Sequence, residues 1–179
     1  EQQIKVTTPI EYVSYPCRVS EPTKLDLDLT TEFNFLTVAQ LSPRKNVDQL
    51  IRTFVDKFKD NDNVGLIIKA NTAKNSLIDR NHTLANFRKV FNNLKPYKCK
   101  LYLLHGYLTE SEMSGLYTHP KVKAMVSTTH GEGFGLPLFE AAYYGLPVIA
   151  TDWSGHTDFL YMPQKQKNGK IKNKNMFGK

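Results

Sequence analysis

Two glutamates that flank a glycine-rich run are the residues of this sequence best suited to chemistry on a ligand. Glu132 and Glu140 stand eight positions apart, and glycines occupy alternate positions from 131 to 135. Glycines allow the backbone to turn sharply and to approach a ligand closely. A carboxylate accepts at least two hydrogen bonds, which suits the paired hydroxyls of a ribose or a hexose.

A helix is expected directly after this run, with Pro137 in its first turn and Gly145 just past its end. The free N–H groups at the start of such a helix favour a phosphate or diphosphate. The glycines differ in spacing from G-x-G-x-x-G and lie late in the chain, so the run is not the dinucleotide fingerprint. The competing interpretation is a glycine-rich turn without a ligand, in which Glu132 is a solvated loop acid and Glu140 complements the helix dipole.

The elements that would position this run alternate between strand and helix. Short apolar runs predict strands, and amphipathic patterns between them predict helices. Unbroken apolar strands between helices favour a parallel sheet covered on both faces, a Rossmann-like α/β layer, with ligands beyond the carboxyl ends of the strands. Asn46 is the expected cap of the first helix, and Thr109 with Glu112 forms a capping box. The strands are expected at 35–38, 64–68, 101–104, 124–126 and 148–150, and the helices at 47–58, 84–94, 109–117 and 137–144.

Length and charge predict one globular domain with a basic tail. The chain has 179 residues and a net charge of +7, and six lysines without any acid lie in residues 164–179. The remaining residues therefore carry about +1, which argues against a nucleic-acid partner. We expect an N-terminal strand (10–15) and connecting segment over 1–32, the Rossmann-like domain over 33–162, and a mobile tail over 163–179. An anionic membrane surface is the alternative partner of that tail.

Cysteine usage and hydropathy predict a cytoplasmic protein. Cys17 and Cys99 provide neither a disulfide framework nor the spacing of a metal site. No apolar run reaches the roughly 18–20 residues of a membrane span, and no signal peptide opens the sequence. Asp26 and Asp28 form a D-x-D pair without a preceding apolar strand, so we do not interpret them as metal ligands.

The run from Glu132 to Glu140 resembles the E-x7-E signature of the group 1 glycosyltransferases of the GT-B fold, which commonly reads E-G-F-G-L-P-x-x-E. The continuation through Ala150 resembles the family's E-A-x-x-x-G-x-P-V-V-A. Residues 38–46 resemble its first strand end, and residues 105–117 resemble the segment that closes around the nucleotide base. The resemblance covers about residues 33–160 and is to the C-terminal, donor-binding half of the enzyme.

This resemblance implies transfer from a nucleotide-diphosphate sugar with retention at the anomeric carbon. In the family, the second glutamate holds the ribose, which points to Glu140, and the first lies near the reacting centre, which points to Glu132. Lys45 is the expected catalytic cation, and charge on the leaving phosphate would be stabilised there without reorganisation. No tightly bound cofactor and no metal are expected. The other donor-binding candidates are Gly133, Phe134, Gly135, Leu136, Arg44, Tyr107 and Leu108.

One position departs from the family pattern. The family pairs an arginine after the first strand with a lysine about five residues on, and here Gln40 occupies the arginine's place. Neutralisation of the diphosphate is then expected to rest on Lys45, with Arg44 as a substitute. His130 and the segment 155–158 are further candidates for contact with the donor.

The length also predicts half of a two-domain enzyme. An N-terminal acceptor domain is expected to be missing, and the acceptor, whether glycan, lipid or protein, is open. The isolated chain should bind a donor or nucleotide with little transfer. The alternatives are a non-catalytic nucleotide-sugar-binding module and another GT-B reaction, such as epimerisation or phosphorolysis.

Overall fold

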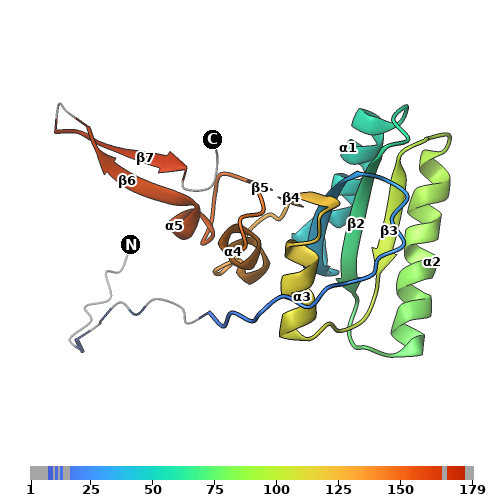
Figure 1. The fold of residues 1–179 in the computed structure, drawn as a ribbon, viewed down its shortest axis with the longest axis horizontal. Helices are drawn as coiled ribbons and strands as arrows, with labels where there is room; N and C mark the ends of the chain where they lie inside the picture. The colour runs from blue at the N-terminus through green and yellow to red at the C-terminus, as the bar shows by residue number, and fades with distance from the viewer. Residues whose placement is uncertain (1–7, 10, 12, 14–16, 167–168, 176–179) are drawn as a thin grey trace, which may run out of the picture.

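The computed structural model describes residues 8–9, 11, 13, 17–166 and 169–175. Its centre is a five-stranded sheet in the order β3-β2-β1-β4-β5, in which every neighbouring pair is parallel (Figure 1). The Rossmann-like parallel fold expected from the sequence is therefore confirmed. The strands are β1 (Phe33–Gln40), β2 (Val64–Asn71), β3 (Lys100–Leu104), β4 (Val122–Ser127) and β5 (Val148–Ala150).

Helices cover both faces of this sheet. On one face α1 and α2 pack against alternate residues of β1 and β2, such as Leu66 and Ile68. On the other face α3 and α4 pack against the intervening residues, such as Leu36 and Ile67. Two buried faces explain why the strands read as unbroken apolar runs. The helices are α1 (Val47–Phe58), α2 (Leu77–Leu94), α3 (Glu110–Tyr117), α4 (Leu136–Tyr143) and the short α5 (Thr157–Leu160), with a 3-10 turn at Pro43–Lys45.

The N-terminal ends of the helices agree with the capping predictions at α3 and differ from the sequence-based expectations at α1 and α2. Thr109 and Glu112 form the expected capping box at α3. Asn46 does occupy the N-cap of α1, but its side chain makes no capping bond. Its backbone is left-handed (φ 53°), and its amide donates to the Thr128 carbonyl at 3.3 Å, so it links α1 to the end of β4 instead. Helix α2 begins at Leu77, seven residues before the expected 84, because the Ser76 side chain caps it.

At the C-terminal end of the chain, the described residues contain regular structure where a tail was expected. The predicted strand at 10–15 lies outside the described residues, apart from Glu11 and Val13. In the predicted tail, β6 (Tyr161–Lys165) and β7 (Ile171–Asn175) pair as an antiparallel hairpin that extends away from the main sheet (Figure 1). A solvated, mobile segment was expected there, because the residues from Lys165 onward include few apolar side chains. The mobility of this tail stays a prediction.

The connecting segment before β1 lies across helix α3. The Thr23 N–H donates to the Ser111 carbonyl at 2.9 Å, and Leu29 is buried with the α3 and α4 core. Gly115 of α3 permits this approach, because a Cβ at that position would lie 1.9 Å from the Thr23 carbonyl oxygen. The segment is therefore packed as part of the domain.

Gly115→Ala tests this packing. In a helix without the contact, alanine would stabilise by about 1 kcal/mol relative to glycine. Here we expect the free energy of unfolding to fall by about 1–3 kcal/mol, because a methyl group is forced against backbone. Urea denaturation measures the change. Gly133→Ala is the control, since its Cβ would meet no atom within 4 Å. A Gly115→Ala variant more stable than the parent would contradict the packing.

Candidate functional site

The sequence-predicted residues lie in two groups beyond the carboxyl ends of the strands. One group joins Glu132, in the loop after β4, to Arg44 and Lys45, in the turn after β1. The other group surrounds a pocket between α3 and α4, which includes Leu108, Leu136 and Glu140. Parallel strands end at one edge of a sheet, and this brings segments distant in the sequence together.

Glu132 makes two ion pairs with the turn after β1. Its Oε1 accepts a hydrogen bond from Lys45 Nζ at 2.6 Å, and its Oε2 accepts one from Arg44 Nη1 at 3.1 Å. Arg44 also donates to the Gly131 carbonyl. The side chains of Glu132 and Lys45 are 10% and 15% exposed, whereas that of Arg44 is 54% exposed. Lys45 is therefore the shielded partner and Arg44 the open one.

These cations keep Glu132 ionised. Burial, the largest single influence, raises the pKa of the Glu132 carboxyl, but hydrogen bonds from Lys45 and Arg44 outweigh it and the pKa is lowered. At neutral pH the group carries one negative and two positive charges. Because one of the cations is in excess, the group as a whole can attract an anion.

The loop after β5 fixes the backbone of Glu132. The Ser154 hydroxyl accepts from the Glu132 N–H at 2.8 Å and donates to the Glu132 carbonyl at 2.7 Å. Gly155 donates to the same carbonyl at 3.1 Å and packs so closely that a Cβ would lie 1.9 Å from the Gly133 carbonyl oxygen. Ser154 adopts a left-handed backbone (φ 91°), an unfavourable conformation for a residue with a side chain. Sequence reasoning missed Ser154, which no local pattern marks.

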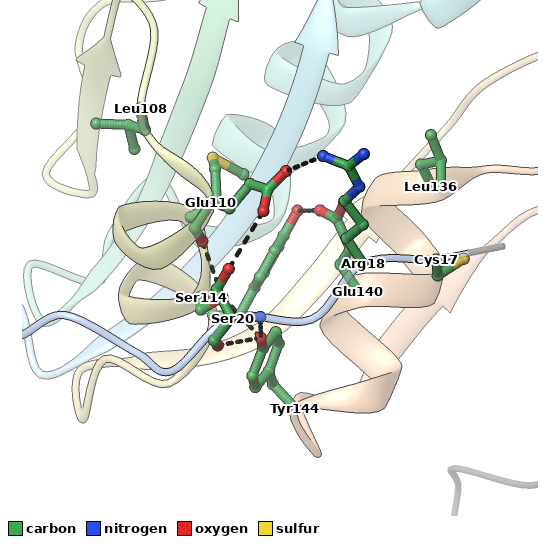
Figure 2. A pocket seen from close by; sticks show the side chains of 11 residues that line it. Cys17, Arg18, Ser20, Leu108, Glu110, Ser114, Leu136, Glu140 and Tyr144 are labelled. Atoms are coloured by element: carbon green, nitrogen blue, oxygen red, sulfur yellow. Dashed lines mark hydrogen bonds and ion pairs between the residues drawn. The ribbon is translucent and has the colours of Figure 1, made fainter.

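The pocket between α3 and α4 has a volume of about 410 Å³ (Figure 2). Glu140 lies in its wall and accepts a hydrogen bond from the Tyr117 hydroxyl at 2.8 Å. Burial raises the pKa of Glu140, the bond from Tyr117 opposes this, and Glu110 adds to the rise. The lining residues are Cys17, Arg18, Ser20, Leu108, Glu110, Met113, Ser114, Tyr117, Leu136, Glu140 and Tyr144.

The N-terminal segment contributes a wall of this pocket that sequence reasoning did not anticipate. The hydroxyl of Tyr144 accepts from the Ser20 N–H at 3.1 Å and donates to the Ser20 carbonyl at 2.6 Å. Arg18 Nη1 lies 3.9 Å from Glu110 Oε1, so Arg18 adds a further cation to the lining of the pocket (Figure 2). These residues precede β1 by more than ten positions, and nothing in their spacing indicates a site.

Three of the predicted donor-binding residues, and Gln40 at the position of the family's arginine, have surroundings different from these two groups. Tyr107 is 64% exposed and lies outside the lining of the pocket. The ring of Phe134 packs on two phenylalanines, with centroids 5.5 Å from Phe139 and 5.0 Å from Phe159. Gly135 caps α4 with a φ of 90°. Gln40 is exposed at the end of β1, where its amide donates to the Thr72 carbonyl at 3.3 Å.

The loop after β3 is held by buried polar groups. Lys69 of β2 is 8% exposed and donates to the Gly106 carbonyl, and burial lowers the pKa of its ammonium group. His105 Nε2 lies 2.9 Å from Asp79 Oδ2, and this hydrogen bond is the largest cause of the lowered pKa of Asp79. Both bonds join the loop to neighbouring elements and so support Leu108 at the pocket.

Within the ranges that the structure describes, no three His, Cys, Asp or Glu side chains cluster closely enough to hold a metal ion. Among the helices in those ranges, none combines the length and the apolar character of a membrane span.

Comparison with known proteins gives one family match and several partial relatives. A family model described as "Glycosyl transferases group 1" matches residues 24–169. The serotype-specific mannosyltransferase WbdA of Escherichia coli is 29% identical over 121 residues, which cover 66% of this chain and 13% of WbdA. The GtfA subunit of a UDP-N-acetylglucosamine–peptide N-acetylglucosaminyltransferase of Streptococcus pneumoniae is 28% identical over 121 residues, or 67% of this chain and 21% of GtfA. The chain thus spans 13% to 21% of the length of these relatives.

Solved structures share the fold. Anabaena HepE in complex with UDP-glucose has a TM-score of 0.50 at 18% identity, over 71% of this chain and 32% of that chain. An Escherichia coli structure described as trehalose-6-phosphate bound with UDP-2-fluoro glucose has a TM-score of 0.55 at 14% identity, over 72% and 31%. At these identities the likeness concerns the arrangement of the sheet and helices.

The ion pairs of Glu132 predict a pH-dependent stability. A carboxyl whose pKa is lowered by folding stabilises the folded state above its unfolded pKa, about 4.3, and loses this contribution as the pH falls through the folded value. We expect Glu132→Gln to lower the free energy of unfolding by about 1–3 kcal/mol at pH 7, because two cations lose their partner. Urea denaturation between pH 7 and pH 3 measures the difference, which should close in acid.

Glu32→Gln is the control, since Glu32 pairs with Lys121 at 2.9 Å but is 68% exposed. Its effect should stay below about 1 kcal/mol at every pH. A Glu132→Gln deficit that persists undiminished at pH 3 would show that the ion pairs do not cause it.

Proposed function

The chain belongs to the group 1 glycosyl transferase family, and from this premise we propose that it binds the nucleotide-diphosphate sugar donor of a glycosyltransferase that acts with retention. The pocket at Glu140 would take the nucleoside, and the group around Glu132 would take the diphosphate and the sugar. The neighbouring loops would supply backbone amides from Gly133 to Leu136.

The carboxylate of Glu140 in the pocket is the observation that carries this proposal. Its Oε2 is held by Tyr117, whereas Oε1 makes no hydrogen bond to any part of the chain that the structure describes. A volume of about 410 Å³ falls within the range of small-molecule sites, about 300–1,000 Å³. A fixed carboxylate with one open oxygen suits the hydroxyls of a ribose. Leu108 and Leu136 offer apolar contact to the base or the sugar.

The group around Glu132 suits the reacting end of a donor. When the bond between sugar and diphosphate breaks, negative charge develops on the leaving phosphate. Lys45 and Arg44 are already fixed at this edge by Glu132, so they would stabilise that charge without rearrangement. Lys45 and Arg44 would supply the positive charge that a metal ion supplies in metal-dependent enzymes. Glu132 would face the sugar, where a carboxylate can bind hydroxyls.

Ligands of related proteins agree with a nucleoside diphosphate. HepE is described with UDP-glucose, and the Escherichia coli structure is described with UDP-2-fluoro glucose. The relatives named by activity transfer mannose or N-acetylglucosamine, so the sugar is left open. Because the chain spans a minor part of those relatives, we propose that a separate domain provides most of the contacts to the acceptor, whether glycan, lipid or protein. Transfer by the isolated chain should then be slight.

Isothermal titration calorimetry with UDP, GDP and ADP tests the proposal. We expect at least one to bind the chain, and Glu140→Ala to weaken that binding by about tenfold or more, the equivalent of 1.4 kcal/mol. Glu32→Ala is the matched control, since Glu32 adjoins the start of β1 at the opposite edge of the sheet. Absence of binding by all three nucleotides would refute the donor site. Equal affinities of the parent and Glu140→Ala would refute the ribose assignment.

A further inference from the structure

Trp153 is the one tryptophan of the sequence, and it lies exposed at the functional edge. The residue is 66% exposed, in the loop between β5 and α5. A covered tryptophan side chain buries about 150–250 Å² of surface area. An exposed tryptophan therefore contributes little of this hydrophobic stabilisation to the folded state. No other aromatic ring among the described residues stacks on it. The exposed indole is therefore available for contact with a ligand beside the group around Glu132.

The indole is held in a fixed position relative to Glu132. Its Nε1–H donates to the His130 carbonyl at 2.8 Å, and the His130 N–H donates to the Arg44 carbonyl at 2.8 Å. A Cβ on Gly131 would lie 3.9 Å from Nε1, so the indole rests against the glycine that precedes Glu132. The next residue, Ser154, clamps the Glu132 backbone. The ring is thus exposed but anchored to the loop that carries Glu132.

The neighbours of the ring favour a saccharide as its occupant. Arg44 is open to solvent and donates to the carbonyl of Gly131, the residue against which the indole rests, and to the Glu132 carboxylate. Charged hydrogen-bonding groups are therefore attached to the loop on which the ring rests. A pyranose presents C–H groups on its faces and hydroxyls at its rim, which match a ring and charged hydrogen-bonding groups respectively. Tryptophan and arginine are also enriched at protein–protein interfaces, but acidic residues and lysine are depleted there, and the loop beside the ring carries Glu132 paired with Lys45. A protein partner is therefore the less favoured occupant.

The proposed nucleotide pocket does not account for Trp153. That pocket is lined by residues of the N-terminal segment, the loop after β3, α3 and α4, and none of its lining residues comes from the loop 151–156 (Figure 2). Glu132 lies in the loop that leads into α4 and contacts the loop 151–156 through Ser154. The ring therefore adjoins the site on the side of Glu132.

We propose that Trp153 is the platform of a second saccharide subsite, on which a pyranose ring of the acceptor stacks beside Glu132. The assignment of this sugar to the acceptor rests on the proposed transferase function. Arg44 contributes hydrogen bonds to the rim of the sugar, and the strained Ser154 turn keeps the indole in place. The subsite is a specificity-determining contact and takes no part in bond cleavage.

Because the chain has a single tryptophan, its intrinsic fluorescence reports on the surroundings of Trp153 alone. The 179-residue chain is titrated with methyl α-mannopyranoside, methyl α-glucopyranoside and methyl N-acetyl-α-glucosaminide. Each is added to about 100 mM, so that a dissociation constant in the millimolar range, about −4 kcal/mol or weaker, is detected. We expect at least one sugar to shift the emission to shorter wavelength and to lower the acrylamide quenching constant about twofold, because a stacked ring loses solvent. UDP alone should leave both unchanged.

Three results would overturn the proposal. No effect of any sugar would exclude the platform. An effect of UDP alone, as large as that of a sugar, would assign Trp153 to the nucleotide site. Quenching that falls as the protein concentration rises, without sugar, would identify a protein contact surface instead.

A variant pair gives a second readout. Saturation-transfer NMR signals of the effective sugar should fall about fivefold in Trp153→Ala and persist in Tyr143→Ala, an aromatic of similar exposure (56%) on α4. Equal signals in the two variants would refute the subsite. Calorimetry with UDP, GDP and ADP on the parent chain and on Trp153→Ala separates the two proposals. Failure of all three nucleotides to bind the parent chain would refute the donor site and leave the sugar result standing. Loss of nucleotide binding in Trp153→Ala alone would assign the indole to the donor site and refute the saccharide subsite.

Discussion

A carboxylate withdrawn from water remains charged only when hydrogen bonds and cations compensate the lost solvation, and Glu132 depends on this compensation. Lys45 and Arg44 provide it from the turn after β1, while Ser154 and Gly155 fix its backbone from the loop after β5. Three loops that are distant in the sequence are thereby held in one arrangement. The same charges that stabilise this edge are those that would bind the diphosphate of the proposed donor.

The sheet makes that arrangement possible. Because all five strands are parallel, their carboxyl ends meet at one edge, and the loops that follow β1, β4 and β5 become neighbours. The layer of α3 and α4 then forms the pocket around Glu140, and the N-terminal segment completes its wall. Gln40 stands where the family pattern has an arginine. Lys45 and Arg44 pair with Glu132, and Arg18 lines the pocket at Glu140.

The sequence predicted those features that local periodicity or spacing determines. The apolar stripe of α1, the capping box of α3 and the run from Glu132 to Glu140 each lie within a short stretch of chain, and the structure has the corresponding elements. The clamp by Ser154 and the bond from Lys69 to Gly106 join residues that only the fold brings together, so no local pattern marks them. The first turns of α2 were missed because exposed side chains there lack helical periodicity.

The central claim is that the pocket at Glu140 and the ion pairs of Glu132 form one donor site. Amide chemical-shift mapping by NMR during titration with a UDP-sugar tests it most directly. Shifts are expected in both groups together, at Leu108, Tyr117 and Glu140 as well as at Glu132 and Ser154. Shifts confined to the cavity of about 610 Å³ between α1 and α2, around Val47 and Phe87, would contradict it.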